Sequence, residues 1–168
     1  LVEYTRGFGL DLGAGQDRVW PHFLTVDSGK DYGGRKVADV LCECDDLKFW
    51  ADGACDFVVS SHLLEHIQDY KAALKEWFRV IRPGGHLCLY LPHRDLYPRI
   101  GQPGSNPDHK HDFCNQDIVD AMREVCPDWT LLEDEVRGED NEYSFFQVFR
   151  KEAQGTGQVE APWKFNPK

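Results

Sequence analysis

The sequence predicts an α/β fold built on a mainly parallel sheet, on three observations. Short apolar segments alternate with amphipathic ones along the 168 residues, which is typical of strands joined by helical crossovers. The first five apolar segments show little alternation, as expected of parallel strands covered on both faces. The last two segments alternate better and follow each other directly, so they indicate an antiparallel pair at one edge of the sheet.

The strands are expected at seven places along the chain. These are residues 8–13, 23–27, 37–42, 56–61, 86–92, 129–136 and 143–150. Only ten residues separate Gly13 from Leu24, and Pro21 limits helix formation within them. The first crossover is therefore shortened and holds no full helix.

Two segments carry the single apolar stripe of a surface helix. The first runs over 70–81, with Asp69 available as N-cap and a Pro-Gly-Gly turn at 83–85 that stops it. The second starts with Asn115 as its expected cap and continues to about residue 125. Both helices are expected to pack on the sheet.

Size, composition and charge define the broad class of the protein. The chain fits one domain over residues 1–150, followed by a tail or linker at 151–168 that is rich in Gly, Pro and polar residues. The net charge of −10, without a basic stripe, argues against a nucleic-acid partner. No apolar run is long enough for a membrane span, and the first residues do not resemble a signal peptide, so we expect a cytoplasmic protein.

Carboxylates flank a glycine turn near the start of the chain. The first strand carries Asp11 and is followed by Gly13-Ala14-Gly15, whose bare backbone lets a polar ligand approach closely. The next strand ends at Asp27, where a Rossmann-type half places the acid that binds a ribose. Arg18 occupies the place of a third glycine, which together with the short crossover argues against NAD or FAD.

Four motifs in order resemble the class I S-adenosylmethionine-dependent methyltransferases, and more narrowly their type 11-like members. They are GLDLGAG, LTVDSG, CECDDLKFWADGACDFVVSSHLLEHI and EWFRVIRPGGHLCLYLPH, within residues 8–93. The resemblance implies a Rossmann-like sheet of seven strands, six parallel and one antiparallel edge strand, with helices on both faces. It also implies S-adenosylmethionine as cofactor and S-adenosylhomocysteine as product.

The resemblance implies a set of cofactor-binding residues. The glycine turn would line the methionine end, Asp27 would hold the ribose, and the segment around Glu43 would contact adenine. The full set is Asp11, Gly13, Ala14, Gly15, Asp27, Ser28, Glu43, Cys44, Asp45, Ser60 and Ser61. One departure is the turn Leu47-Lys48-Phe49, where the family has Leu-Pro-Phe.

Two short patterns suggest a metal. HLLEH at 62–66 matches the H-x-x-E-H pattern of some zinc peptidases, which needs His62 and His66 one turn apart on a helix. His109 and His111 would point the same way in an extended segment. Because each pattern lacks a further ligand at suitable spacing, and the family commonly has a similar Leu-Glu-His, no metal site is predicted.

Methyl transfer to a hydroxyl group needs a base, and histidine suits that role near neutral pH. The loop at 92–113 is expected to cover the carboxyl ends of the strands as a substrate lid. The unranked candidates for the base are His62, His93, His109 and His111. Their number favours an O-methyltransferase over one acting on an amine.

The loop and the tail are similar to those of bacterial methyltransferase domains found beside, or fused to, glycosyltransferases of surface-polysaccharide synthesis. This implies a small-molecule or sugar acceptor and a glycosyltransferase domain or partner. A non-catalytic, S-adenosylmethionine-binding interaction module is the alternative, because the first crossover is short. The sequence specifies neither the acceptor nor the oligomeric state.

Overall fold

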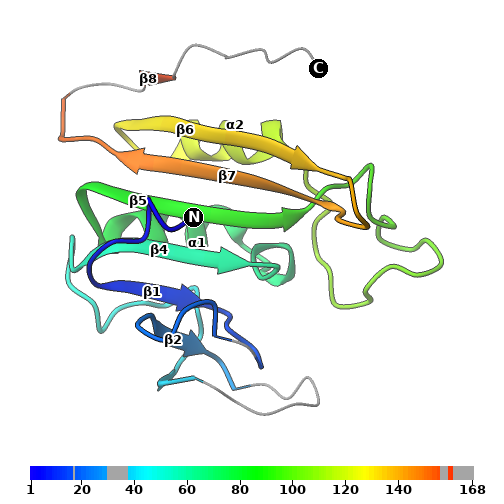
Figure 1. The fold of residues 1–168 in the computed structure, drawn as a ribbon, viewed down its shortest axis with the longest axis horizontal. Helices are drawn as coiled ribbons and strands as arrows, with labels where there is room; N and C mark the ends of the chain where they lie inside the picture. Colours follow the sequence, from blue (N-terminus) through cyan, green and yellow to red (C-terminus); the bar gives the residue numbers. More distant parts are fainter. Residues whose placement is uncertain (17, 30–37, 156–158, 161–168) are drawn as a thin grey trace.

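A mixed sheet forms the centre of the computed structural model, which describes residues 1–16, 18–29, 38–155 and 159–160 (Figure 1). Its strands are β1 (Gly9–Leu12), β2 (Leu24–Asp27), β3 (Val40–Leu41), β4 (Cys55–Ser61), β5 (Ile81–Pro92), β6 (Trp129–Arg137), β7 (Ser144–Lys151) and β8 (Val159–Glu160). The predicted strand at 37–42 starts at a residue outside the described ones, and the described part of it contains β3.

The order of the strands confirms the predicted fold class. It is β3-β2-β1-β4-β5-β7-β6-β8, and β7 runs antiparallel to both of its neighbours. Strands β1 to β6 all run in one direction, as expected of six parallel strands and one antiparallel strand. The antiparallel strand lies between β5 and β6 rather than outermost, and the two-residue β8 adds to β6 from within the predicted tail.

Two α-helices follow β4 and β5. Helix α1 (Tyr70–Val80) begins as predicted, because the Asp69 carboxylate accepts a hydrogen bond of 3.0 Å from the Ala72 N–H. Helix α2 (Asn115–Val125) is capped by Cys114 instead of Asn115. The Cys114 N–H donates to the Asp117 carboxylate at 2.8 Å, and the Asn115 side chain is instead turned to Asp134 on β6.

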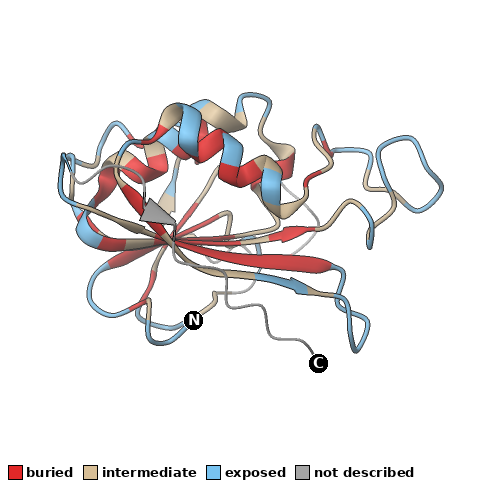
Figure 2. Ribbon diagram, turned by 90° about the horizontal axis from the view of Figure 1, so that it is seen from above, coloured by how far each residue is buried: buried red, intermediate tan, exposed pale blue. Residues whose placement is uncertain are grey.

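Among the described residues, both α-helices pack on the same face of the sheet, so the expectation of helices on both faces is wrong for this part of the chain (Figure 2). Successive side chains of β5 point to opposite faces of the sheet. Leu87 and Leu89 belong to the larger core under the helices, whereas Cys88 belongs to a smaller aromatic cluster on the opposite face. Tyr4 and Val19 pack against that smaller cluster from irregular segments.

The connection between β1 and β2 contains no helix in its described residues, which confirms the shortened crossover. The carboxyl ends of β1, β2, β4 and β5 lie along one edge of the sheet, and the long loop after β5 projects from the same edge (Figure 1). Open α/β sheets bind ligands at this edge. None of the described helices has the length and apolar composition that crossing a membrane requires.

Candidate active site

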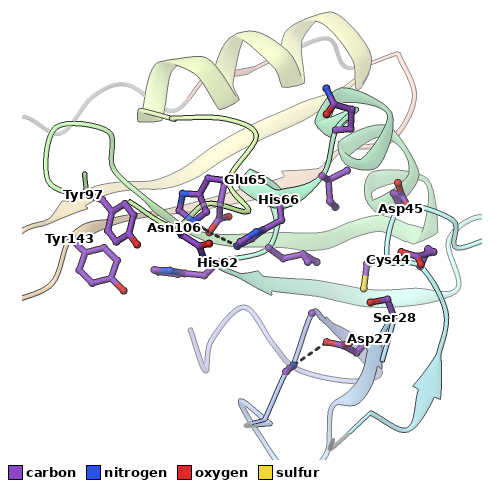
Figure 3. A pocket seen from close by; sticks show the side chains of 17 residues that line it. Asp27, Ser28, Cys44, Asp45, His62, Glu65, His66, Tyr97, Asn106 and Tyr143 are labelled. Carbon is purple, nitrogen blue, oxygen red and sulfur yellow. Dashed lines mark hydrogen bonds and ion pairs between the residues drawn. The ribbon is translucent and has the colours of Figure 1, made fainter. Parts of the chain in front are cut away.

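A cavity of about 520 Å³ lies at the carboxyl ends of the parallel strands (Figure 3). This volume is in the range of small-molecule sites. Its wall combines the turns after β1 and β2, the segment after β3, the residues around the 3₁₀ turn η1 (Leu64–His66), the loop after β5 and the β6–β7 hairpin. The lining residues are Gly13, Gly15, Asp27, Ser28, Glu43, Cys44, Asp45, His62, Leu63, Glu65, His66, Ile67, Gln68, Tyr97, Asn106, His109 and Tyr143.

Two hydrogen bonds join the glycine turn to the end of β2. The Gly13 N–H donates to the Val26 carbonyl at 2.8 Å, and the Gly15 N–H donates to Oδ2 of Asp27 at 3.1 Å. The other oxygen of Asp27 accepts a hydrogen bond of 2.8 Å from the Gly29 N–H. Gly13 has φ = 74° and Gly15 has φ = 57°, in the left-handed region that favours glycine.

The segment after β3 forms the neighbouring wall. The Trp77 indole N–H donates to the Cys44 carbonyl at 2.7 Å, so helix α1 holds this segment against the sheet. Burial raises the pKa of the Cys44 thiol to about 12, which keeps the thiol protonated and unreactive at neutral pH. Asp27, Glu43 and Asp45 line the same end of the cavity, and this end therefore suits a ligand that carries positive charge.

Seven of the eleven predicted cofactor-binding residues line the cavity. They are Gly13, Gly15, Asp27, Ser28, Glu43, Cys44 and Asp45. The other four lie outside its lining. The carboxylate of the buried Asp11 accepts from the Val19 N–H at 3.1 Å, and burial raises its pKa. The buried Ser60 hydroxyl donates to the Leu12 carbonyl at 3.3 Å, and neither Ala14 nor Ser61 lines the cavity.

His62 stands at the opposite end of the cavity, directly after β4. Its backbone N–H donates to the Tyr90 carbonyl at 2.8 Å, and its Nε2 atom lies 3.0 Å from the Ser144 hydroxyl. These contacts hold a residue whose φ is 50°, which is unusual outside glycine. Burial lowers the pKa of His62, with smaller effects from the neighbouring His109 and His66, so its imidazole is neutral at pH 7.

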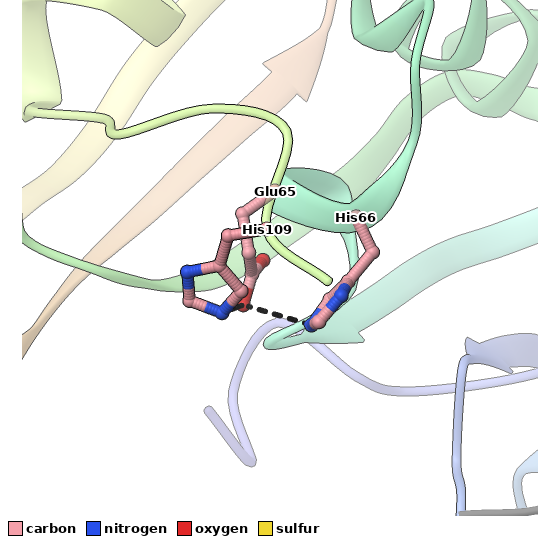
Figure 4. A group of neighbouring side chains, drawn as sticks. All are labelled: Glu65, His66 and His109. Carbon is pink, nitrogen blue, oxygen red and sulfur yellow. Dashed lines mark ion pairs between the residues drawn. The ribbon is translucent and has the colours of Figure 1, made fainter. Parts of the chain in front are cut away.

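Glu65, His66 and His109 form a cluster in the cavity wall (Figure 4). Oε1 of Glu65 lies 3.8 Å from Nε2 of His66 and 3.8 Å from Nε2 of His109. Glu65 is fully buried, and burial raises its pKa to about 8. The pKa values of both histidines are lowered, also chiefly by burial. The cluster is therefore a group of ionisable side chains whose charged forms are disfavoured by burial.

Two of the four predicted histidine bases lie outside the cavity lining. Nε2 of His111 lies 3.0 Å from the Ile67 carbonyl, and its ring stacks on Phe113, so this side chain anchors the loop. Nδ1 of His93 accepts from the Asp95 N–H at 3.2 Å, and this bond shapes the turn after β5. The structure thus leaves His62 and His109 as the predicted candidates in the cavity.

The helix that the zinc-peptidase pattern needs is not formed. Only the 3₁₀ turn Leu64–His66 follows β4, so His62 and His66 do not share a helical face. Glu65, His66, Tyr97, Asn106 and Tyr143 also line the cavity, and none of them was predicted as a site residue from the sequence. Glu65 and His66 were visible within HLLEH, whereas Tyr143 comes from a hairpin that only the sheet topology brings to this edge.

The central segment of the chain is similar to known methyltransferases. Residues 10–89 match the family model of a methyltransferase domain. A curated protein of Mycolicibacterium smegmatis, named as a probable S-adenosylmethionine-dependent methyltransferase, is 28% identical over 71 residues. That match covers 42% of this chain and 28% of the relative's length, so most of the relative lies outside it.

Solved methyltransferase structures share the fold. An S-adenosylmethionine-dependent methyltransferase from Mesorhizobium loti is 14% identical, with a TM-score of 0.64 over 90% of this chain and 94% of that chain. A Burkholderia thailandensis 1,6-didemethyltoxoflavin-N1-methyltransferase, solved with S-adenosylhomocysteine, is 17% identical, with a TM-score of 0.63 over 89% of this chain and 72% of that chain. The Rossmann-like architecture is thus shared at low sequence identity.

Proposed function

We propose that this chain is a class I S-adenosylmethionine-dependent methyltransferase and that it transfers a methyl group to a hydroxyl of a small molecule or sugar; the match of residues 10–89 to a methyltransferase domain supports the first part. One observation carries the proposal: a single cavity has an acidic, glycine-lined end and a histidine-lined end (Figure 3). The first end suits the cofactor, and the second suits an acceptor that must lose a proton.

At the acidic end, the cofactor is assigned to the residues that the motifs predict. Asp27 faces the cavity with two oxygens that each retain accepting capacity beyond their backbone bonds, so the ribose hydroxyls can donate to it. Glu43 and Asp45 line the part of the cavity where the motifs place adenine, and their carboxylates can accept hydrogen bonds from its amino group. When bound, S-adenosylmethionine supplies a methyl group on a positively charged sulfur, which a nucleophile attacks in line.

At the other end, we assign the base to His62. In the tautomer whose Nε2–H donates to the Ser144 hydroxyl, the Nδ1 atom keeps a lone pair for the acceptor's proton. The lowered pKa keeps this ring neutral and ready to accept a proton at pH 7. Ser144 fixes the orientation of the ring, as a positioning residue does for a catalytic histidine.

A sugar acceptor fits the aromatic side of this end. The rings of Tyr97 and Tyr143 lie with centroids 5.0 Å apart, and both line the cavity. Such rings offer an apolar face for a sugar ring, and their hydroxyls can bond to its hydroxyls. With the sequence resemblance, this supports a cytoplasmic role in surface-polysaccharide synthesis, with a glycosyltransferase domain or partner.

Product analysis tests the hydroxyl assignment. The chain would be incubated with S-adenosylmethionine and matched panels of sugars, simple diols and amines, and methylated products would be located by mass spectrometry. We expect methyl ethers of the hydroxyl compounds together with S-adenosylhomocysteine. Methylated amines alone would refute the hydroxyl acceptor. Tight cofactor binding with no product from any panel would favour the non-catalytic binding module instead.

A further inference from the structure

The carboxylate of Glu65 is buried without a hydrogen-bond partner in the described part of the chain. Its side chain is fully buried, and within the described residues neither of its oxygens accepts a hydrogen bond. Buried carboxylates are normally hydrogen-bonded, paired at short distance or bound to a metal. The two imidazole Nε2 atoms at 3.8 Å are too far from Oε1 for hydrogen bonds. Both oxygens of Glu65 are therefore without a hydrogen-bond partner among the described residues.

The spacing of these three side chains suits a shared cation. The ligand atoms of Glu65, His66 and His109 all lie within 4.8 Å of one another (Figure 4). A metal bound at about 2.1 Å from each ligand holds such atoms about 3 to 3.5 Å apart. The ligand atoms would therefore have to move closer together by up to about 1 to 2 Å on binding a metal.

The backbone already holds the two halves of the cluster together. The Lys110 N–H and the His111 N–H donate to the Glu65 carbonyl at 2.7 and 3.3 Å. These bonds fix the loop after β5 to the 3₁₀ turn, so His109 is brought to Glu65 and His66 without a ligand. The ring of Tyr97 packs against His109, with centroids 5.3 Å apart, and restricts its rotation. A site prepared in this way loses little entropy on binding.

We propose that Glu65, His66 and His109 bind a divalent transition-metal cation through one carboxylate oxygen and two imidazole nitrogens. Two imidazoles favour Zn²⁺, Ni²⁺ or a similar transition-metal ion over Mg²⁺ and Ca²⁺, which prefer an all-oxygen set. Three protein ligands leave coordination positions open, and the cluster lines the same cavity as His62. Each of the two sequence patterns supplies only part of this ligand set.

Resting on the proposed methyl transfer, the cation would select an acceptor with two neighbouring oxygens. A vicinal diol of a sugar can occupy two open positions, and the cation's charge lowers the pKa of a hydroxyl that it contacts. The hydroxyl proton goes to His62, the hydroxyl oxygen forms the new bond to the methyl carbon, and the bond from that carbon to sulfur breaks. The products are the methyl ether, S-adenosylhomocysteine and a protonated His62.

Metal binding can be tested without any acceptor. The chain would be stripped of metal with EDTA, exchanged into chelator-free buffer and titrated with ZnCl₂ and with NiCl₂ by calorimetry. We expect saturable binding of about one cation per chain for at least one of the two metals. Glu65→Gln keeps the side-chain shape, and His109→Ala removes one imidazole. Each should weaken binding at least about 100-fold, since losing even an outer partner of a metal site costs up to that much.

His22→Ala is the matched control, because His22 is an exposed histidine outside the cavity lining. It should bind the cation as tightly as the unaltered chain. The proposal would be overturned if Glu65→Gln bound the cation as tightly as the unaltered chain, or if the unaltered chain showed no saturable binding. Circular dichroism checks that each variant is folded. S-adenosylmethionine titrated into the same metal-free samples tests the cofactor site separately, so failure of the metal site and failure of the proposed function give different results.

Discussion

The backbone N–H of Gly15 donates a 3.1 Å hydrogen bond to Oδ2 of Asp27 and so joins the turn after β1 to the end of β2. In a chain whose first crossover is too short for a helix, this bond and the Gly13–Val26 bond fix the shape of the turn. The same carboxylate therefore shapes the cavity wall and is the group that we assign to the cofactor's ribose.

Gly13→Ala should damage both the fold and cofactor binding. A Cβ at Gly13 would lie 2.8 Å from Cδ2 of Leu63, and its φ of 74° strains any other residue. We expect a loss of about 2–3 kcal/mol in the free energy of unfolding, measured by urea denaturation. Gly101→Ala is the control, because Gly101 has φ = 83° but nothing within 4 Å of its added Cβ. Equal losses in both variants would show that the contact with Leu63 is unimportant.

Cysteine labelling should follow burial. Cys42 and Cys114 are partly exposed, whereas the other four cysteines are buried. Burial raises the pKa of Cys44 to about 12, so its thiolate is scarce at pH 8. Iodoacetamide followed by peptide mass spectrometry should find Cys42 and Cys114 modified first. Early modification of Cys44 would mean that the wall after β3 opens in solution.

Without metal, Glu65 should make stability fall as pH rises. Its pKa is about 8 in the folded chain and 4.5 ordinarily, so between these values the folded state binds more protons than the unfolded state. The free energy of unfolding therefore decreases across this window, by on the order of 4 kcal/mol. The measurement is urea denaturation in EDTA at pH 5 and at pH 8. The free energy of unfolding of Glu65→Gln, relative to that of the unaltered chain, should increase from pH 5 to pH 8. A pH-independent difference between the two proteins would contradict this.

His62→Ala should lower turnover far more than cofactor affinity. Losing a general base costs about 10²–10⁴-fold in rate. The measurement is S-adenosylhomocysteine release with the best hydroxyl acceptor of the panel. His93→Ala is the control, since the ring of His93 lies outside the cavity lining and should leave the rate nearly unchanged. If His62→Ala retains full rate, His62 is not the base.

The sequence predicted the strands, the helices and the acidic end of the cavity because those features depend on local patterns. The apolar stripe of α1, the Asp69 cap and the motif around Asp27 are each contained in a few neighbouring residues. The Asn115 cap was wrong because a tertiary contact with Asp134 takes that side chain, and the Cys114–Asp117 bond replaces it.

The histidine end was harder to predict because it is assembled from distant segments. His109 reaches Glu65 only through the path of the loop after β5, which its Pro- and Gly-rich sequence does not specify. The helical reading of HLLEH paired His62 with His66, whereas the 3₁₀ turn directs them to different partners. Tyr143 reaches the cavity because β7 is inserted beside β5.

The central claim is that this cavity binds S-adenosylmethionine through Asp27. Calorimetric titration of the chain with S-adenosylmethionine and with S-adenosylhomocysteine tests it most directly, alongside Asp27→Ala and the control Asp52→Ala, whose side chain is 83% exposed. We predict micromolar binding that Asp27→Ala weakens about tenfold or more and that Asp52→Ala leaves unchanged. No binding by the unaltered chain, or equal binding by Asp27→Ala, would contradict it.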